Sequence, residues 1–99
     1  MDKYEINANR FKALNDPNRL KIIDLLSCGE LCACELLKYF GFTQPTLSHH
    51  MKILQECELV MSRKQGVWNY YRLNNKITNK TMLFLMEIIT DTEECVCKN

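Results

Sequence analysis

The middle of the chain holds two helical segments separated by a tight turn, and this pattern decides the fold class. Residues 32–40 have an apolar side and stop at Gly41, and Thr43 can cap a second helix over residues 44–57. In that second helix the apolar residues recur at i, i+4 and i+7, as Leu47, Met51 and Leu54. Helix, glycine turn and helix together predict a helix-turn-helix.

A β-hairpin is expected directly after the second helix. Residues 59–64 and 67–73 have the composition of strands, and Gln65-Gly66 between them suits a tight turn. A hairpin in this position is a wing. The predicted fold class is therefore mainly α with a small β-hairpin, a winged helix-turn-helix.

Two further helices are expected before this unit. Apolar spacing predicts the first over residues 3–14. Asp16-Pro17 marks the start of the second, because Asp caps free N–H groups and Pro is tolerated in the first turn. The second helix is expected to reach about Leu26 and to end at Gly29. Its predicted buried residues are Leu20, Ile23 and Leu26.

The last helix predicts association with a second copy. Its segment, from Ile77 to about Thr90, is apolar nearly all round, which exceeds what one small core can bury. We therefore expect residues 1–99 to form a single domain that dimerises through this helix and ends in a cysteine-containing tail at about residues 91–99.

No apolar stretch approaches the roughly 18 residues needed to span a bilayer, so we expect a cytoplasmic protein with no membrane partner.

The cysteines indicate a site for a soft ion. The chain has six, and four of them form two C-x-C pairs, Cys32 with Cys34 and Cys95 with Cys97. In a cytoplasmic chain this clustering favours reduced thiols over a disulfide framework. Neighbouring C-x-C thiols are poor partners for an ordinary disulfide and good ligands for one thiophilic ion. The isolated Cys28 and Cys57 are expected to be structural.

The spacing of the first pair constrains how an ion is held. Side chains two residues apart on an intact helix point about 200° apart. Cys32 and Cys34 can therefore share an ion only if Cys32 lies at the helix edge or the first turn unwinds. We expect ligation to distort this helix and displace the helix over residues 44–57, the recognition helix of the helix-turn-helix, which packs on it. If the ion takes a third thiolate besides Cys32 and Cys34, we expect it from Cys95 or Cys97 of the same or the other subunit. The alternative is an ion site made of Cys95 and Cys97 alone.

The charge distribution favours double-stranded DNA as a partner although the net charge is only +1. Residues 36–80 carry seven Lys or Arg and two Glu, a balance of +5, while residues 81–99 carry one Lys and four acids, a balance of −3. His50 is expected to be a packing residue near the core side of the recognition helix. The candidate DNA contacts on that helix and at the hairpin tip are Gln44, Pro45, Thr46, Ser48, His49, Lys52, Arg63 and Lys64.

Over about residues 5–90 the chain resembles the ArsR/SmtB family of metal-responsive repressors. The matching stretches are Phe11-Lys12-Ala13-Leu14-Asn15-Asp16-Pro17-Asn18-Arg19-Leu20-Lys21-Ile22-Ile23, Cys32-Ala33-Cys34-Glu35-Leu36, Gln44-Pro45-Thr46-Leu47-Ser48-His49-His50-Met51 and Tyr70-Tyr71-Arg72-Leu73. The resemblance implies a homodimer that binds operator DNA when free of ion and releases it when the ion binds. The inducer this implies is As(III) or Sb(III), with Cd(II), Pb(II) or Zn(II) as alternatives.

Two positions depart from the family pattern. Leu37 stands where some arsenic sensors have a third cysteine, and Glu58 stands where a glycine commonly ends the recognition helix. A thiol–disulfide redox sensor on the same fold is a related alternative. A thiol enzyme or a metal buffer is disfavoured because no set of nucleophile, base and orienting group can be assembled, and a buffer needs no wing. We therefore expect neither enzymatic activity nor a small organic substrate.

Overall fold

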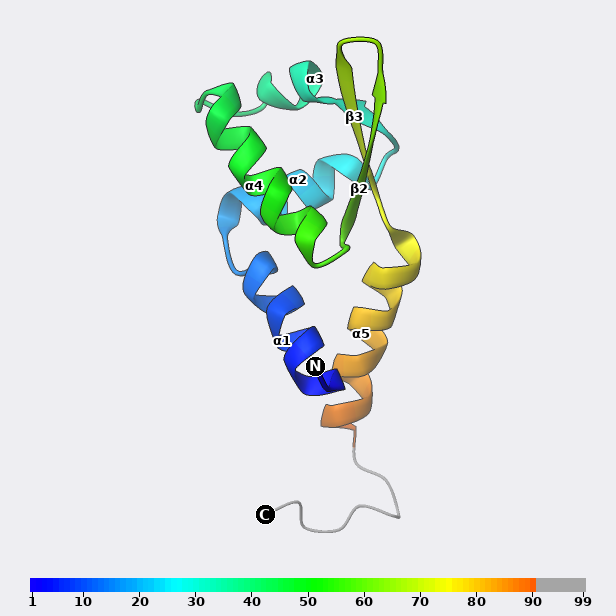
Figure 1. Ribbon diagram of the computed structural model, residues 1–99. Helices are drawn as coiled ribbons and strands as arrows, with labels where there is room; N and C mark the ends of the chain where they lie inside the picture. Colours follow the sequence, from blue (N-terminus) through cyan, green and yellow to red (C-terminus); the bar gives the residue numbers. More distant parts are fainter. Residues whose placement is uncertain (91–99) are drawn as a thin grey trace.

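The first and last helices lie side by side at one end of the molecule, and the other elements form the opposite end (Figure 1). The structure is a computed structural model of the 99-residue chain and describes residues 1–90. In chain order its elements are α1 (Lys3–Leu14), α2 (Pro17–Leu26), β1 (Leu31–Cys32), α3 (Ala33–Leu37), α4 (Gln44–Glu56), β2 (Val60–Gln65), β3 (Trp68–Leu73) and α5 (Asn75–Ile89).

The predicted helix start at Asp16-Pro17 is confirmed. The Asp16 carboxylate accepts hydrogen bonds from the backbone N–H groups of Asn18 (2.8 Å) and Arg19 (3.1 Å), two donors that have no partner within the helix. These hydrogen bonds and the neighbouring Arg19 guanidinium lower the pKa of Asp16 below its ordinary value. The cap fixes where α2 begins and so which of its residues face the core.

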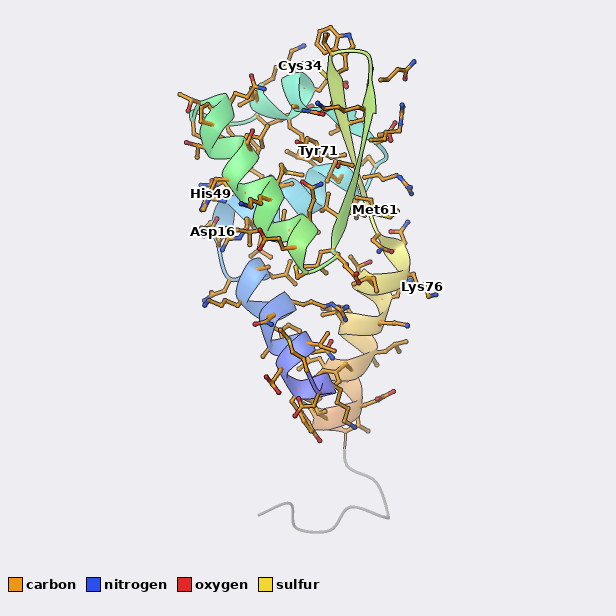
Figure 2. All side chains as sticks on the ribbon, viewed as in Figure 1. Asp16, Cys34, His49, Met61, Tyr71 and Lys76 are labelled. Carbon is orange, nitrogen blue, oxygen red and sulfur yellow. A yellow bond between two sulfur atoms is a disulfide. The ribbon has the colours of Figure 1, made fainter. Side chains whose placement is uncertain are left out.

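The core lies between α2, α4 and the sheet, and Tyr71 of β3 contributes to it from between α4 and the hairpin (Figure 2). The prediction that Leu20 is buried is wrong: its side chain is 52% exposed, and Ile22 is buried instead. The prediction for Leu26 is confirmed. The fully buried apolar side chains are Ile22, Leu36, Leu47, Met51, Leu54 and Leu59.

The hairpin is present and belongs to a three-stranded antiparallel sheet of order β1-β3-β2. Its turn is one residue later than predicted, because Gln65 pairs with Trp68 and leaves Gly66-Val67 as the two-residue loop. Gly66 has a φ of 62°, and the first position of such a loop favours glycine because it requires a positive φ. The third strand, β1, was not predicted.

Two helix boundaries differ from the prediction. The helix expected over residues 32–40 is α-helical only from Ala33 to Leu37. After it, the N–H groups of Tyr39 and Phe40 donate to carbonyls three residues earlier, so the chain continues as tight turns. The last helix begins at Asn75, two residues before Ile77, because the Asn74 side chain caps it. No helix within residues 1–90 is long and apolar enough to cross a membrane.

Candidate functional site

The outer side of α4 is a polar, exposed surface. Leu47, Met51 and Leu54 hold the helix against the core. The residues of α4 that were predicted to contact DNA are all exposed. His49 lies on the outer side of α4 (Figure 2). The six exposed candidates on this helix are Gln44, Pro45, Thr46, Ser48, His49 and Lys52.

His50 faces inward, as predicted. Its side chain is 8% exposed, and its Nδ1 lies 3.2 Å from the Nη1 of Arg19, which donates to it. Burial lowers the pKa of His50, and the nearby Arg19 charge adds to that effect while Asp16 opposes it. A neutral, buried imidazole that accepts from Arg19 ties α4 to α2 and is not available to contact a base.

The two basic candidates on the hairpin differ in their surroundings. Arg63 and Lys64 are both exposed residues of β2. Arg63, however, forms a bidentate ion pair with Glu30, in which Nη2 lies 2.6 Å from Oε1 and Nε lies 3.0 Å from Oε2. Its charge is thus compensated within the protein.

Cys32 and Cys34 lie together at the start of α3. Cys32 is 5% exposed and has extended backbone angles, φ −81° and ψ 160°, as the residue that precedes the helix. Cys34 is exposed, beside the upper part of the hairpin in Figure 2. The structure joins the two sulfurs in a disulfide with the Cα atoms 5.4 Å apart. The two sulfurs come together because an extended Cys32 turns its side chain toward Cys34.

The helix need not unwind for the two sulfurs to meet. Of the two geometries that the spacing left open, the structure has the one in which Cys32 lies at the helix edge. Its backbone N–H donates to the Glu35 side chain over 3.0 Å, and β1 pairs it with Tyr70 of β3. The expected distortion of the first helical turn on ligation is thus not required by the geometry.

Cys28 and Cys57 stand apart from this pair. Cys28 is exposed after α2, and Cys57 is half-buried at the end of α4, where its thiol lies 3.5 Å from the Leu54 carbonyl and burial raises its pKa. Cys95 and Cys97, both predicted ligands, lie outside the described residues. Within residues 1–90, no group of three His, Cys, Asp or Glu side chains could hold a metal ion.

Glu30 is the residue at the site that the sequence did not reveal. It directly precedes β1 and forms the ion pair with Arg63, which lies 33 positions away in the chain. Arg63 lowers the pKa of Glu30, first through the hydrogen bonds. The pairing of β1 with β3, and of β3 with β2, brings the two residues together, and the two-residue β1 carries no strand pattern of its own.

These features define a winged helix-turn-helix regulator with a pair of cysteines beside its recognition helix. The sequence comparisons agree: the profile described as "Bacterial regulatory protein, arsR family" matches residues 16–62. The chain is 56% identical to the arsenical resistance operon repressor of Staphylococcus aureus over 96 residues, which is 97% of this chain and 92% of that protein. The chain belongs to the ArsR family.

Other relatives support the assignment. The arsenical resistance operon repressor of Staphylococcus xylosus is 54% identical over 97% of this chain and 92% of its own length. An ArsR-like regulator from a Rhodococcus species superposes with a TM-score of 0.76 at 32% identity, over 86% of this chain and 80% of that one. A homodimeric winged helix-turn-helix DNA-binding domain from Mycobacterium bovis gives 0.72 at 28% identity, with the same coverage. The protein is a transcriptional regulator and not an enzyme, and the predicted fold class is confirmed.

Proposed function

We propose that this protein is a repressor that leaves its operator when As(III) or Sb(III) binds the thiolates of Cys32 and Cys34. The observation that carries the proposal is that these two sulfurs lie together where β1 ends and α3 begins, and β1 pairs with β3 of the wing. Soft sulfur ligands favour thiophilic ions, and the relatives named above are arsenical resistance operon repressors. Cd(II), Pb(II) and Zn(II) are the alternative inducers.

The exposed side of α4 is the proposed DNA-contacting surface. It has amide, hydroxyl and imidazole groups that can reach base edges, and Lys52 for a phosphate. Lys64 extends the positive charge onto the hairpin, where a phosphate backbone would pass. We propose that residues 1–99 form a single DNA-binding domain.

A homodimer is the proposed binding form. Six apolar residues of α5 are exposed, and Tyr4 of α1 adds its ring at 5.9 Å from that of Phe84, so both helices contribute to one apolar surface. A second copy would bury it and place two recognition helices on one operator. The exposed apolar residues of α5 are Met82, Leu83, Leu85, Met86, Ile88 and Ile89.

The proposed ion site needs a third sulfur. Arsenite that reacts with three thiols forms three As–S bonds and releases three waters, and its oxidation state does not change. The disulfide must first be reduced by two electrons and two protons, which a cytoplasmic thiol reductant supplies. Cys32 and Cys34 supply two ligands. We propose Cys95 or Cys97 for the third.

Operator binding by the reduced protein tests the function. Fluorescence anisotropy of labelled operator DNA is expected to show loss of affinity of about 5- to 150-fold when arsenite is added, the usual range for coupled sites. Cys32→Ser and Cys34→Ser should keep DNA binding and lose the response. Cys28→Ser is the matched control, because that thiol is exposed and outside the pair. An unchanged arsenite response in both Cys32→Ser and Cys34→Ser contradicts the proposal.

Redox sensing is a second candidate, favoured by the Cys32–Cys34 disulfide itself. Peroxide would oxidise the two thiols to the disulfide and be reduced to two waters. Release of operator by peroxide in the absence of any ion, reversed by dithiothreitol, would support this function. A response to arsenite but not to peroxide would exclude it.

A further inference from the structure

The Glu30–Arg63 ion pair joins the segment that carries the cysteines to the wing. Glu30 directly precedes β1, which ends at Cys32, and Arg63 lies in the middle of β2. The two oxygens of Glu30 accept three contacts from Arg63, at 2.6, 3.0 and 3.1 Å. Two-point contact of a planar guanidinium with a carboxylate fixes orientation as well as distance.

The Arg63 guanidinium is held on its remaining sides as well. Its Nη1 donates to the Gln65 side chain over 2.9 Å, and its central carbon lies 4.5 Å from the centre of the Tyr70 ring. Three of its nitrogens therefore have protein acceptors, and one face is stacked. The contacts of the Arg63 guanidinium are thus made within the protein, and this leaves it less available to bind a phosphate.

The strand register explains why these residues meet. Cys32 pairs with Tyr70 across β1 and β3, and Tyr70 pairs with Arg63 across β3 and β2. The three residues stand in one row across the sheet, and Glu30 flanks that row at the β1 edge. Cys32 and Arg63 are therefore connected by two adjacent routes, the backbone ladder and the ion pair of Glu30 with Arg63.

We propose that Glu30, through its ion pair with Arg63, is the positioning residue that transmits ligation of Cys32 and Cys34 to the wing. The inference rests on the function proposed above and adds how the ion site communicates with the DNA-contacting surface. It assigns no direct ligand role to Glu30. It also replaces the predicted DNA-contact role of Arg63 with a role in coupling.

A coupling role and a DNA-contact role of Arg63 predict different outcomes for the substitutions Glu30→Gln and Arg63→Gln. If the pair transmits the signal, Glu30→Gln and Arg63→Gln break one contact and give the same phenotype. If Arg63 instead contacts a phosphate and Glu30 competes for it, Glu30→Gln strengthens operator binding and Arg63→Gln weakens it. Glu58→Gln is the matched control, because it removes a carboxylate that is paired at 3.8 Å with Arg10 of α1 and not with a residue of the sheet.

The test uses the reduced full-length protein and two readouts. Trp68 is the one tryptophan in the sequence and lies in β3 at the hairpin turn, so its fluorescence reports on the wing without DNA. Arsenite ligation is followed separately by its near-ultraviolet sulfur-to-arsenic absorption. Operator affinity with and without arsenite then gives the coupling, and thermal unfolding shows whether each variant folds as the wild type does.

We expect arsenite to change Trp68 fluorescence in the wild type and in Glu58→Gln, and to change it less in both Glu30→Gln and Arg63→Gln. An exposed ion pair is worth up to about fivefold in an equilibrium constant, so the ratio of operator affinities without and with arsenite should fall by about three- to fivefold in both. The near-ultraviolet absorption should be unchanged.

Three results overturn the inference: wild-type coupling in either variant, opposite effects of the two substitutions, or no Trp68 response in wild type that has bound arsenite. A Trp68 response that depends on Glu30, combined with an operator that stays bound, supports the inference and contradicts only the proposed repressor function. Absence of arsenite absorption contradicts both.

Discussion

Replacement of Lys52 by Gln is expected to weaken the salt dependence of operator binding. Lys52 is 77% exposed on the outer side of α4, next to the polar residues proposed to contact bases. Its only ion pair within residues 1–90 is with Glu56, at 4.0 Å and open to solvent. Such a pair is worth little, so the lysine is free to exchange Glu56 for a phosphate.

The expected change in the salt dependence follows from the number of lysine–phosphate contacts that the substitution removes. Each phosphate neutralised adds about −0.9 to the slope of log K against log salt, and a symmetric dimer presents Lys52 twice, so the slope should become less negative by about 1.8. Between about 50 and about 200 mM salt, the variant should lose about tenfold less affinity than the wild type. Gln preserves most of the side-chain length and helix propensity.

Fluorescence anisotropy at several salt concentrations measures this slope. Lys76→Gln is the matched control: it removes one exposed lysine from the first turn of α5, on the opposite side of the molecule from His49 in Figure 2. The control should keep the wild-type slope. A wild-type slope in Lys52→Gln, or an equal change in both variants, would refute the placement of DNA on α4.

Three further predictions concern folding and pH. Asp16→Ala removes the cap of α2 and should lower the free energy of unfolding in urea by about 1–2 kcal/mol, whereas Asp16→Asn should retain most of it; equal losses would contradict the cap. The pKa of His50 lies below its ordinary value of 6.5, so the unfolded chain takes up that proton first and stability should fall as pH drops below 6.5. His50→Gln should flatten this fall in a comparison of urea midpoints, and an equally steep fall would contradict the assignment. Glu58→Gly should raise the free energy of unfolding by about 0.5–1 kcal/mol, because Glu58 has a φ of 66°, and a loss of stability in urea would show that no strain is relieved.

Local signals predicted the recognition helix closely. The expected range 44–57 differs from α4 by one residue at its end. Apolar residues at helical spacing fix which side of α4 is buried, so the exposure of His49 and the burial of His50 followed from the same pattern. The Asp16 cap was also predictable, because the carboxylate that accepts and the two backbone N–H groups that donate lie within three residues of each other in the chain.

Contacts between distant segments were not predictable in the same way. β1 is two residues long and exists because Leu31 and Cys32 pair with β3, some forty residues later in the chain. That pairing makes Cys32 extended, which lets its sulfur reach Cys34 and brings Glu30 to Arg63. Sequence reasoning identified the cysteines and the wing but could not show that Cys32 and the wing are parts of one sheet.

The assignment of Leu20 failed for a related reason. In a helix of ten residues, several apolar positions fit a period of 3.6, and the sequence alone does not choose between Leu20 and Ile22. The contact of α2 with α4 and β3 selects Ile22. Leu20 is left exposed on the other side.

X-ray absorption at the arsenic edge of the reduced protein with bound arsenite tests the central claim most directly, because it counts the sulfur neighbours of the ion. With Cys32, Cys34 and one tail cysteine as ligands, the wild type should show three As–S bonds. The variant with both Cys95 and Cys97 replaced by Ser should show two, and the variant with both Cys32 and Cys34 replaced should bind arsenite weakly or not at all. Three As–S bonds in that last variant would contradict the account.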